Sequence, residues 1–157
     1  MTFEVPALTA PLAVATRVPW RAAAATAFAA VLFGRLNAVL YDNERIYELD
    51  REAAVLIPIV FVVALALFAL VSSRALRASA NTNRPARAAL VCGVLAPLGL
   101  VAFWLSLPII LGGLALTLGS EGLKRSQAQG GRRRALAAMA LGASAAAANA
   151  VLWLVMA

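Results

Sequence analysis

The sequence predicts an all-α fold, a polytopic transmembrane helical bundle of about five spans. Hydrophobic residues make up 63% of the 157 residues and charged residues only 13%, whereas soluble domains are about half apolar and about a quarter charged. The apolar residues form segments long enough to cross a bilayer, and most Lys and Arg residues lie in short runs between those segments. Composition, segment length and charge placement therefore all indicate that lipid surrounds most of the chain.

Residues 1–19 are expected to form an irregular segment at the membrane interface. Their early part carries a single charge, on Glu4, and Pro6 and Pro11 interrupt the apolar stretch. A cleavable signal peptide needs a basic start and an unbroken apolar core, so none is expected. Trp20, which follows this segment, suits the depth of the lipid headgroups.

The first span is predicted at residues 20–41, because about 22 residues give roughly 33 Å of helix and a bilayer core measures about 30 Å. Its exception is Arg35. This charge either snorkels outward or pairs with the acidic residues that follow, or it faces a polar path or a partner's carboxylate. Residues 42–52 hold five of the seven acidic residues of the chain and are expected to form a solvated, non-cytoplasmic loop.

The second span is predicted at residues 53–71, which are bulky and uniformly lipophilic. The loop after it, up to residue 87, contains four arginines and no acidic residue. Because basic residues stay on the cytoplasmic side, this loop is expected inside. Residues 20–87 therefore form the first of two predicted units, a hairpin of two spans with an acidic outer loop and a basic inner loop.

The apolar stretch 88–119 is too long for one span, because about 32 residues of helix would measure about 48 Å. A turn at 105–108 divides it into span three, 87–105 with a kink at Pro97, and span four, 109–125. Both flanking basic loops then lie on the cytoplasmic side. Because these two spans are short, a re-entrant hairpin that crosses only part of the bilayer is the alternative.

Span five is predicted at residues 134–156. Small residues at four-residue steps on spans four and five are expected to let the helix backbones approach closely, which is how membrane helices associate. These helix-packing residues are Gly112, Ala115, Gly119, Ala138, Gly142, Ala146 and Ala150. Ala143 and residues 145–148 extend the small residues around the helix, so one face of span five is expected to remain free for another helix. Asn149 and Arg35 are predicted to make polar contacts within the membrane.

The two cytoplasmic loops are predicted to bind anionic lipid headgroups non-specifically. In the loop between spans four and five, the basic residues of this lipid surface are Lys124, Arg125, Arg132, Arg133 and Arg134. Glu121 precedes Lys124 and Arg125 by three and four residues, a spacing that favours a local ion pair at the interface.

A pattern of small and basic residues repeats toward the end of the chain: Leu111-Gly112-Gly113-Leu114-Ala115-Leu116, Lys124-Arg125, Gly130-Gly131, Ala135 and Leu141-Gly142. Through these residues the segment 88–157 resembles the DUF4190 family of small bacterial membrane proteins. Ala138 stands where that family usually has a second glycine, which keeps the residue small. The resemblance implies a three-span membrane module of unknown function, frequent in high-GC Gram-positive bacteria, with no catalytic residues to transfer.

The leading functional hypothesis is a non-enzymatic accessory or structural subunit of the cell membrane, which packs against a larger membrane complex or forms an oligomer. The alternative is a small transporter or channel component, although the spans offer few polar side chains and no inverted repeat. An enzyme would need clustered acidic, His or metal-ligating residues, and the sequence has no histidine and one cysteine. No metal, cofactor or nucleic-acid partner is therefore expected. The N-terminus is expected inside and the C-terminus outside.

Overall fold

The computed structural model is a bundle of five helices, and its described part contains no strand, which confirms the predicted all-α class. It describes residues 18–41, 46–77, 82–101 and 106–155, without the side chains of 34–41, 46–54 and 56. The helices are α1 (Trp20–Tyr41), α2 (Ile46–Ala75), α3 (Arg84–Leu98), α4 (Leu107–Gln129) and α5 (Arg132–Val155). The predicted interfacial segment lies almost wholly in residues 1–17, outside the described residues.

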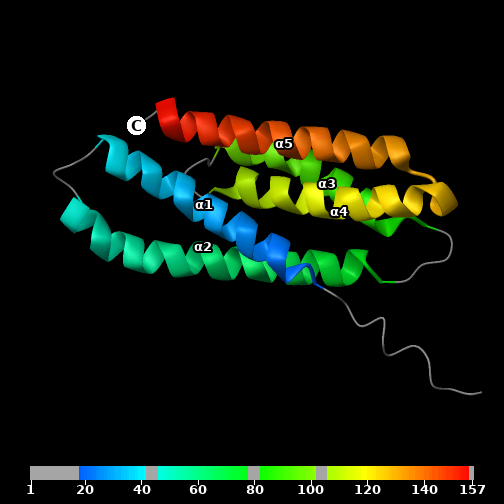
Figure 1. The fold of residues 1–157 in the computed structure, drawn as a ribbon, viewed down its shortest axis with the longest axis horizontal. Helices are drawn as coiled ribbons and strands as arrows, with labels where there is room; N and C mark the ends of the chain where they lie inside the picture. Colours follow the sequence, from blue (N-terminus) through cyan, green and yellow to red (C-terminus); the bar gives the residue numbers. More distant parts are fainter. Residues whose placement is uncertain (1–17, 42–45, 78–81, 102–105, 156–157) are drawn as a thin grey trace, which may run out of the picture.

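The five helices run alternately in opposite directions along the bundle (Figure 1). The starts of α3 and α5 and the ends of α2 and α4 therefore lie toward one end, which we call the basic end because the helices on either side of both predicted basic loops meet there. Helix α1 runs in the same direction as α3 and α5 but begins further inside the bundle. Gly122 near the end of α4 lies against Ala86 in the first turn of α3, so the end of α4 and the start of α3 lie at the same level along the bundle. The opposite end holds the end of α1, the start of α2 and the end of α5.

Part of the acidic segment is helical, where a loop was expected. Helix α2 begins at Ile46, so residues 46–52 are helical, and the prediction of a loop was wrong for them. The physical reason is that Glu, Leu and Arg are good helix formers, and carboxylates near a helix start interact favourably with its dipole. The other acidic-loop residues, 42–45, lie outside the described residues.

The helices on either side of the predicted turn differ in length from the prediction. Helix α3 ends one residue after Pro97, and residues 99–101 continue as a single 3₁₀ turn. Pro97 removes one backbone donor, which favours a helix end over the expected kink within a longer helix. Ser106, the residue before α4, has a φ of 52°, and α4 runs on to Gln129, four residues beyond the expected end at residue 125.

Three helical stretches among the described residues are long and apolar enough to cross a membrane, judged by length and composition alone. They are Ile57–Ala75, Arg84–Val101 and Arg132–Val155. Trp20–Phe33 in α1 is a shorter apolar helix, and α4 is not among the three. The charges that open α2 precede its apolar part, so this helix extends past its candidate span at the end away from the basic end.

The helices pack as a three-helix unit of α3, α4 and α5 and a hairpin of α1 and α2. Within the unit all three helices contact one another extensively, whereas α2 contacts mainly α1. Helix α1 joins the two parts, because Ala27 and Ala30 pack in one cluster with Ile109 and Ile110 of α4. The predicted boundary between two units, at residues 87 and 88, falls inside the first turns of α3.

Candidate functional site

Helices α4 and α5 pack in close backbone contact. A Cβ atom built on Gly112 would lie 2.5 Å from the carbonyl oxygen of Gly142, and one built on Gly142 would lie 2.7 Å from Cβ of Ala115. Real Cβ atoms do not approach other atoms so closely, so only glycine fits at these two positions with the helices at this separation. The two backbones therefore touch directly, as small residues allow in membrane helix pairs.

Helix α4 meets its other neighbours through glycines as well. Gly122 lies against the backbone of Ala86 in α3, where an added Cβ would be 2.8 Å from the Ala86 nitrogen. An added Cβ on Gly113 would overlap Thr26 of α1. The glycines of α4 thus face three different helices, and α4 is the central helix of the bundle.

The predicted helix-packing residues divide into two groups. Five of them are buried: Gly112, Ala115, Gly119, Ala138 and Gly142. The other two, Ala146 and Ala150, are half-buried. Ala146 still packs inward, because an added Cβ on Gly112 would lie 3.1 Å from its Cβ.

The buried line of α5 follows steps of three and four residues in alternation. Its members are Ala135, Ala138, Gly142, Ala145 and Asn149. Four residues turn a helix by about 40° more than one full turn, so three such steps drift by about 120° around the axis. Alternating steps average 3.5 residues and stay on one side. The four-residue series was therefore a good guide near Ala138 and Gly142 and a poorer one toward Ala150.

The two predicted polar contacts have different outcomes. Asn149 is fully buried on the inner line of α5, so its carboxamide faces the other helices. Arg35 lies within α1, but its side chain falls outside the described residues. Its role as a contact with a partner, a polar path or the acidic segment stays a prediction.

Asn83, just before α3, is a structural residue that the sequence analysis did not single out. Its side-chain nitrogen donates hydrogen bonds of 2.8 Å to the carbonyl oxygens of Gly122 and Gly130, and its side-chain oxygen accepts one of 3.2 Å from the Ala86 N–H. Only 6% of the residue is exposed. Asn83 therefore ties the start of α3 to α4 and to the turn between α4 and α5.

A local signal for part of this role is present in the sequence. Asn followed within two residues by Pro is typical of a helix start, and α3 indeed begins with Asn83 as its N-cap. The bonds to Gly122 and Gly130 join residues 39 and 47 positions apart, and no local pattern indicates such partners.

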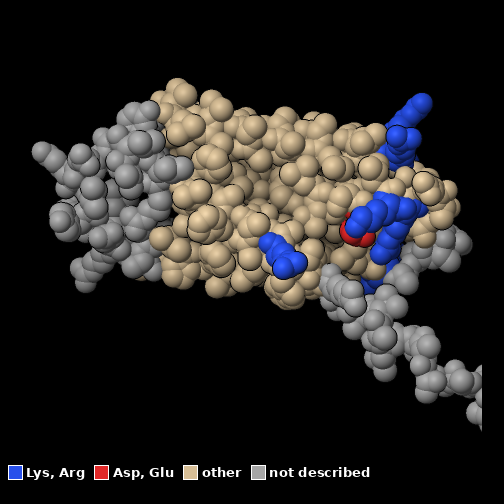
Figure 2. All heavy atoms as spheres, in the orientation of Figure 1, with Lys and Arg blue, Asp and Glu red and all other residues tan. Residues whose placement is uncertain are grey.

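Most Lys and Arg atoms on the face shown in Figure 2 gather at the basic end. The exposed basic residues of the connections and helix ends here are Arg74, Arg77, Arg84, Arg87, Lys124, Arg132, Arg133 and Arg134, and Arg125 is half-buried. Four of the five basic residues predicted for the loop between spans four and five are thus exposed, and so are the four arginines of the other basic loop.

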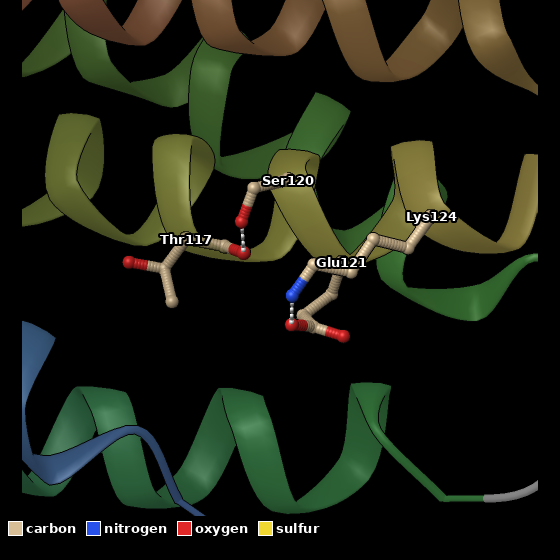
Figure 3. A network of polar contacts seen from close by, with 4 residues as sticks. All are labelled: Thr117, Ser120, Glu121 and Lys124. Carbon is tan, nitrogen blue, oxygen red and sulfur yellow. Dashed lines mark hydrogen bonds and ion pairs between the residues drawn. The ribbon is translucent and has the colours of Figure 1, made fainter.

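The expected ion pair of Glu121 is present. Lys124 Nζ lies 2.7 Å from Glu121 Oε1, and the two side chains lie along one side of α4 with Thr117 and Ser120 (Figure 3). Ser120 Oγ donates to the Thr117 carbonyl at 2.8 Å, and Thr117 Oγ1 donates to the Gly113 carbonyl at 2.7 Å. These hydroxyls are therefore engaged by the backbone of their own helix.

The chemistry of the described residues is that of packing and charge. They include no group of three or more His, Cys, Asp or Glu residues that could hold a metal ion. Cys92 is a buried free cysteine in α3 and packs with alanine and leucine side chains. No family model matches the chain, and neither the curated proteins nor the solved structures compared with it include a match. The resemblance of residues 88–157 to the DUF4190 family accordingly stays a prediction.

Proposed function

We propose that this chain is a five-span protein of the cell membrane that serves as a non-enzymatic accessory subunit, associating with another membrane helix through the outer face of α5. The observation that carries the proposal is the contrast between the exposed faces of its helices. One face consists of small residues, whereas the others carry the bulky side chains that suit lipid.

The outer face of α5 is small in its central turns. Ala140, Ala143, Ser144 and Ala147 are all exposed there. Leu141 is the exposed bulky residue of these turns, but it lies about 100° around the helix axis from Ala140, to one side of the small face. The other exposed bulky residues of α5 lie toward its two ends, at Leu136 and from Val151 onward. Because small residues let two helix backbones come close, this face suits another helix better than it suits acyl chains.

The exposed faces of α2 and α3 differ from this pattern. Val55, Ile59, Val62 and Leu70 are each at least half exposed on α2, and Val91, Val94, Leu95 and Leu98 are exposed on α3. Such exposed apolar side chains match the apolar interior of a bilayer. These helices are therefore the lipid-facing side of the proposed subunit.

The five-span topology is supported by the alternating helix directions and by the charge distribution. Both loops that carry arginines but few carboxylates lie at the basic end, where basic residues favour the cytoplasmic side. In the proposed topology the N-terminus lies inside and the C-terminus outside. A channel component has less support, because the hydroxyls of Thr117 and Ser120 bond to their own helix instead of lining a path.

Reporter fusions test the topology. A reporter joined after Gly130 is expected to be active only as a cytoplasmic protein, and one joined after Asp50 only as an exported protein. The matched control is a fusion after Arg77, which shares the basic end with Gly130. A cytoplasmic signal after Asp50, or an exported signal after Gly130, would contradict five crossings with this orientation.

Substitution of the outer α5 alanines tests the contact. Ala143→Leu and Ala147→Leu, together, are expected to abolish crosslinking to the partner or to a second copy in intact membranes, because the leucines hold the helices apart. Leucine is at least as lipophilic as alanine, so insertion should be unchanged. The measurement is the yield of crosslinked product at equal amounts of membrane protein.

The matched control is Ala66→Leu, which makes the same change at an exposed position of α2. It is expected to leave crosslinking intact. Ala146 is unsuitable for this test, because it packs against Gly112 within the chain, and its enlargement would disturb the fold itself. Crosslinking that survives leucines along the whole outer face of α5 would remove this interface.

A further inference from the structure

We propose that the arginines at the starts of α3 and α5 form one composite surface that binds a phospholipid carrying two phosphate groups. The arginines are Arg84 and Arg87 on α3 and Arg132, Arg133 and Arg134 on α5. The proposal rests on the membrane location given above and goes beyond it, because it names a headgroup chemistry and joins two segments that are far apart in the sequence.

The starts of the two helices lie side by side. Asn83 donates to the Gly130 carbonyl at 2.8 Å, and a Cβ built on Gly131 would be 3.5 Å from the Asn83 side-chain nitrogen and 3.6 Å from Cβ of Ala86. Further along, Gly93 of α3 contacts Ala138 of α5, so the two helices run in the same direction. The two arginine groups therefore stand at the same end and at the same level.

These charges are available to an anion. All five arginines are exposed, and neither α3 nor α5 has an acidic residue in its first turn. Glu121 is the only carboxylate whose side chain the structure describes, and it is paired with Lys124. Positive charge at the start of a helix also interacts unfavourably with the helix dipole, and the two arginine groups repel each other. A bound anion relieves both effects.

Phosphate is the anion that fits this arrangement. The arginine fork binds phosphate through two parallel hydrogen bonds, which an ammonium group does not do. Neighbouring helix axes are about 8–10 Å apart, so the two arginine groups can each take one phosphate of a headgroup that carries two. Basic surfaces between membrane helices on the cytoplasmic side bind lipids of this kind.

The location selects lipid over other sources of phosphate. In the proposed topology the starts of α3 and α5 lie where the membrane helices leave the bilayer on the cytoplasmic side, which is the level of the inner headgroups. A lipid is also concentrated there by its acyl chains, whereas a free phosphate compound is not. The occupant is therefore a two-phosphate phospholipid of the surrounding leaflet.

Native mass spectrometry of the full chain in mild detergent tests the proposal. The chain is titrated with a diphosphatidylglycerol lipid or with twice the concentration of phosphatidylglycerol, so that the total lipid charge is equal. The wild type is expected to retain the two-phosphate lipid about tenfold more tightly. Removing two arginines with Arg84→Gln and Arg87→Gln should abolish that preference, since each basic residue near an anionic surface contributes a severalfold gain in affinity.

Three variants complete the design. Arg133→Gln with Arg134→Gln should lose the preference as the α3 pair does, whereas Arg74→Gln with Arg77→Gln, which removes the same charge at the end of α2, should keep it. Circular dichroism checks that every variant remains helical. Arg84→Lys with Arg87→Lys retains the charge but lacks the fork, and it should show an intermediate preference.

Several outcomes would overturn the proposal. They are equal retention of the two lipids by the wild type, an equal loss in the Arg74 and Arg77 variant, and displacement of the lipid by an equal concentration of inorganic pyrophosphate. Failure of the membrane assignment itself is distinguishable, because the chain would then stay in solution without detergent before any lipid is added.

Discussion

Replacing Gly142 with isoleucine is expected to cause the largest loss of stability among single substitutions in this chain. The added Cβ would lie 2.7 Å from Cβ of Ala115 and 3.1 Å from the carbonyl oxygen of Gly112, so α4 and α5 must separate along their length. Overpacking a core costs about 1–3 kcal/mol, and here two backbones must move, so a loss of about 3 kcal/mol or more is expected. The measurement is the free energy of unfolding in mixed micelles with increasing denaturing detergent.

The matched control for this substitution is Ala143→Ile. Ala143 is the next residue of the same helix and is exposed, so its enlargement can extend outward, away from the other helices. Its effect on the isolated protein should stay within about 0.5 kcal/mol. Equal losses at the two positions would mean that α4 and α5 do not pack through Gly142.

Changing Asn83 to aspartate is the second prediction with a large effect. Aspartate has the same shape and keeps the oxygen that accepts from the Ala86 N–H, but its carboxylate has no hydrogen to donate to the carbonyls of Gly122 and Gly130. Leaving buried acceptors without a donor costs about 1–3 kcal/mol each, so a loss of about 2–4 kcal/mol is expected at neutral pH. Hydrogen exchange at the starts of α3 and α5 should rise together.

Ser120→Ala, which removes a hydroxyl bonded only to its own helix, is the control and should lose little. A loss in the aspartate variant no larger than that of the control would show that the two donated bonds do not hold α3 in place.

The sequence was sufficient for the fold class and for most helix positions because these depend on local composition. Long apolar segments, prolines near helix ends and runs of arginine each act within a few residues. The helical start of α2 was missed for a related reason. Its charged residues were taken to indicate a loop, although several of them have high helix propensity. The correct helix positions and the missed start of α2 both depend on properties of neighbouring residues.

The packing residues depend on contacts between helices that the local sequence does not determine. Small residues were expected at Gly112 and Gly142, and the structure brings these two together, but it also selects Ala145 over Ala146 for the buried line. That choice depends on the rotation of α5 against α3 and α4, which an alanine-rich helix does not encode in its own periodicity. The bonds of Asn83 depend in the same way on a turn that lies 47 residues away.

The central position of α4 has a consequence for the order in which the protein is made. Its glycines face α1, α3 and α5, and Leu116 is its one large apolar side chain that is substantially exposed in the described structure. A ribosome completes α4 before it begins α5, so for the time needed to synthesise some two dozen residues the bare backbone of Gly112 and Gly119 faces either acyl chains or the insertion machinery. In the proposed topology, α4 and α5 would therefore leave that machinery as a pair. A nascent chain halted in the turn at Gly130 would expose the surface most in need of a membrane chaperone.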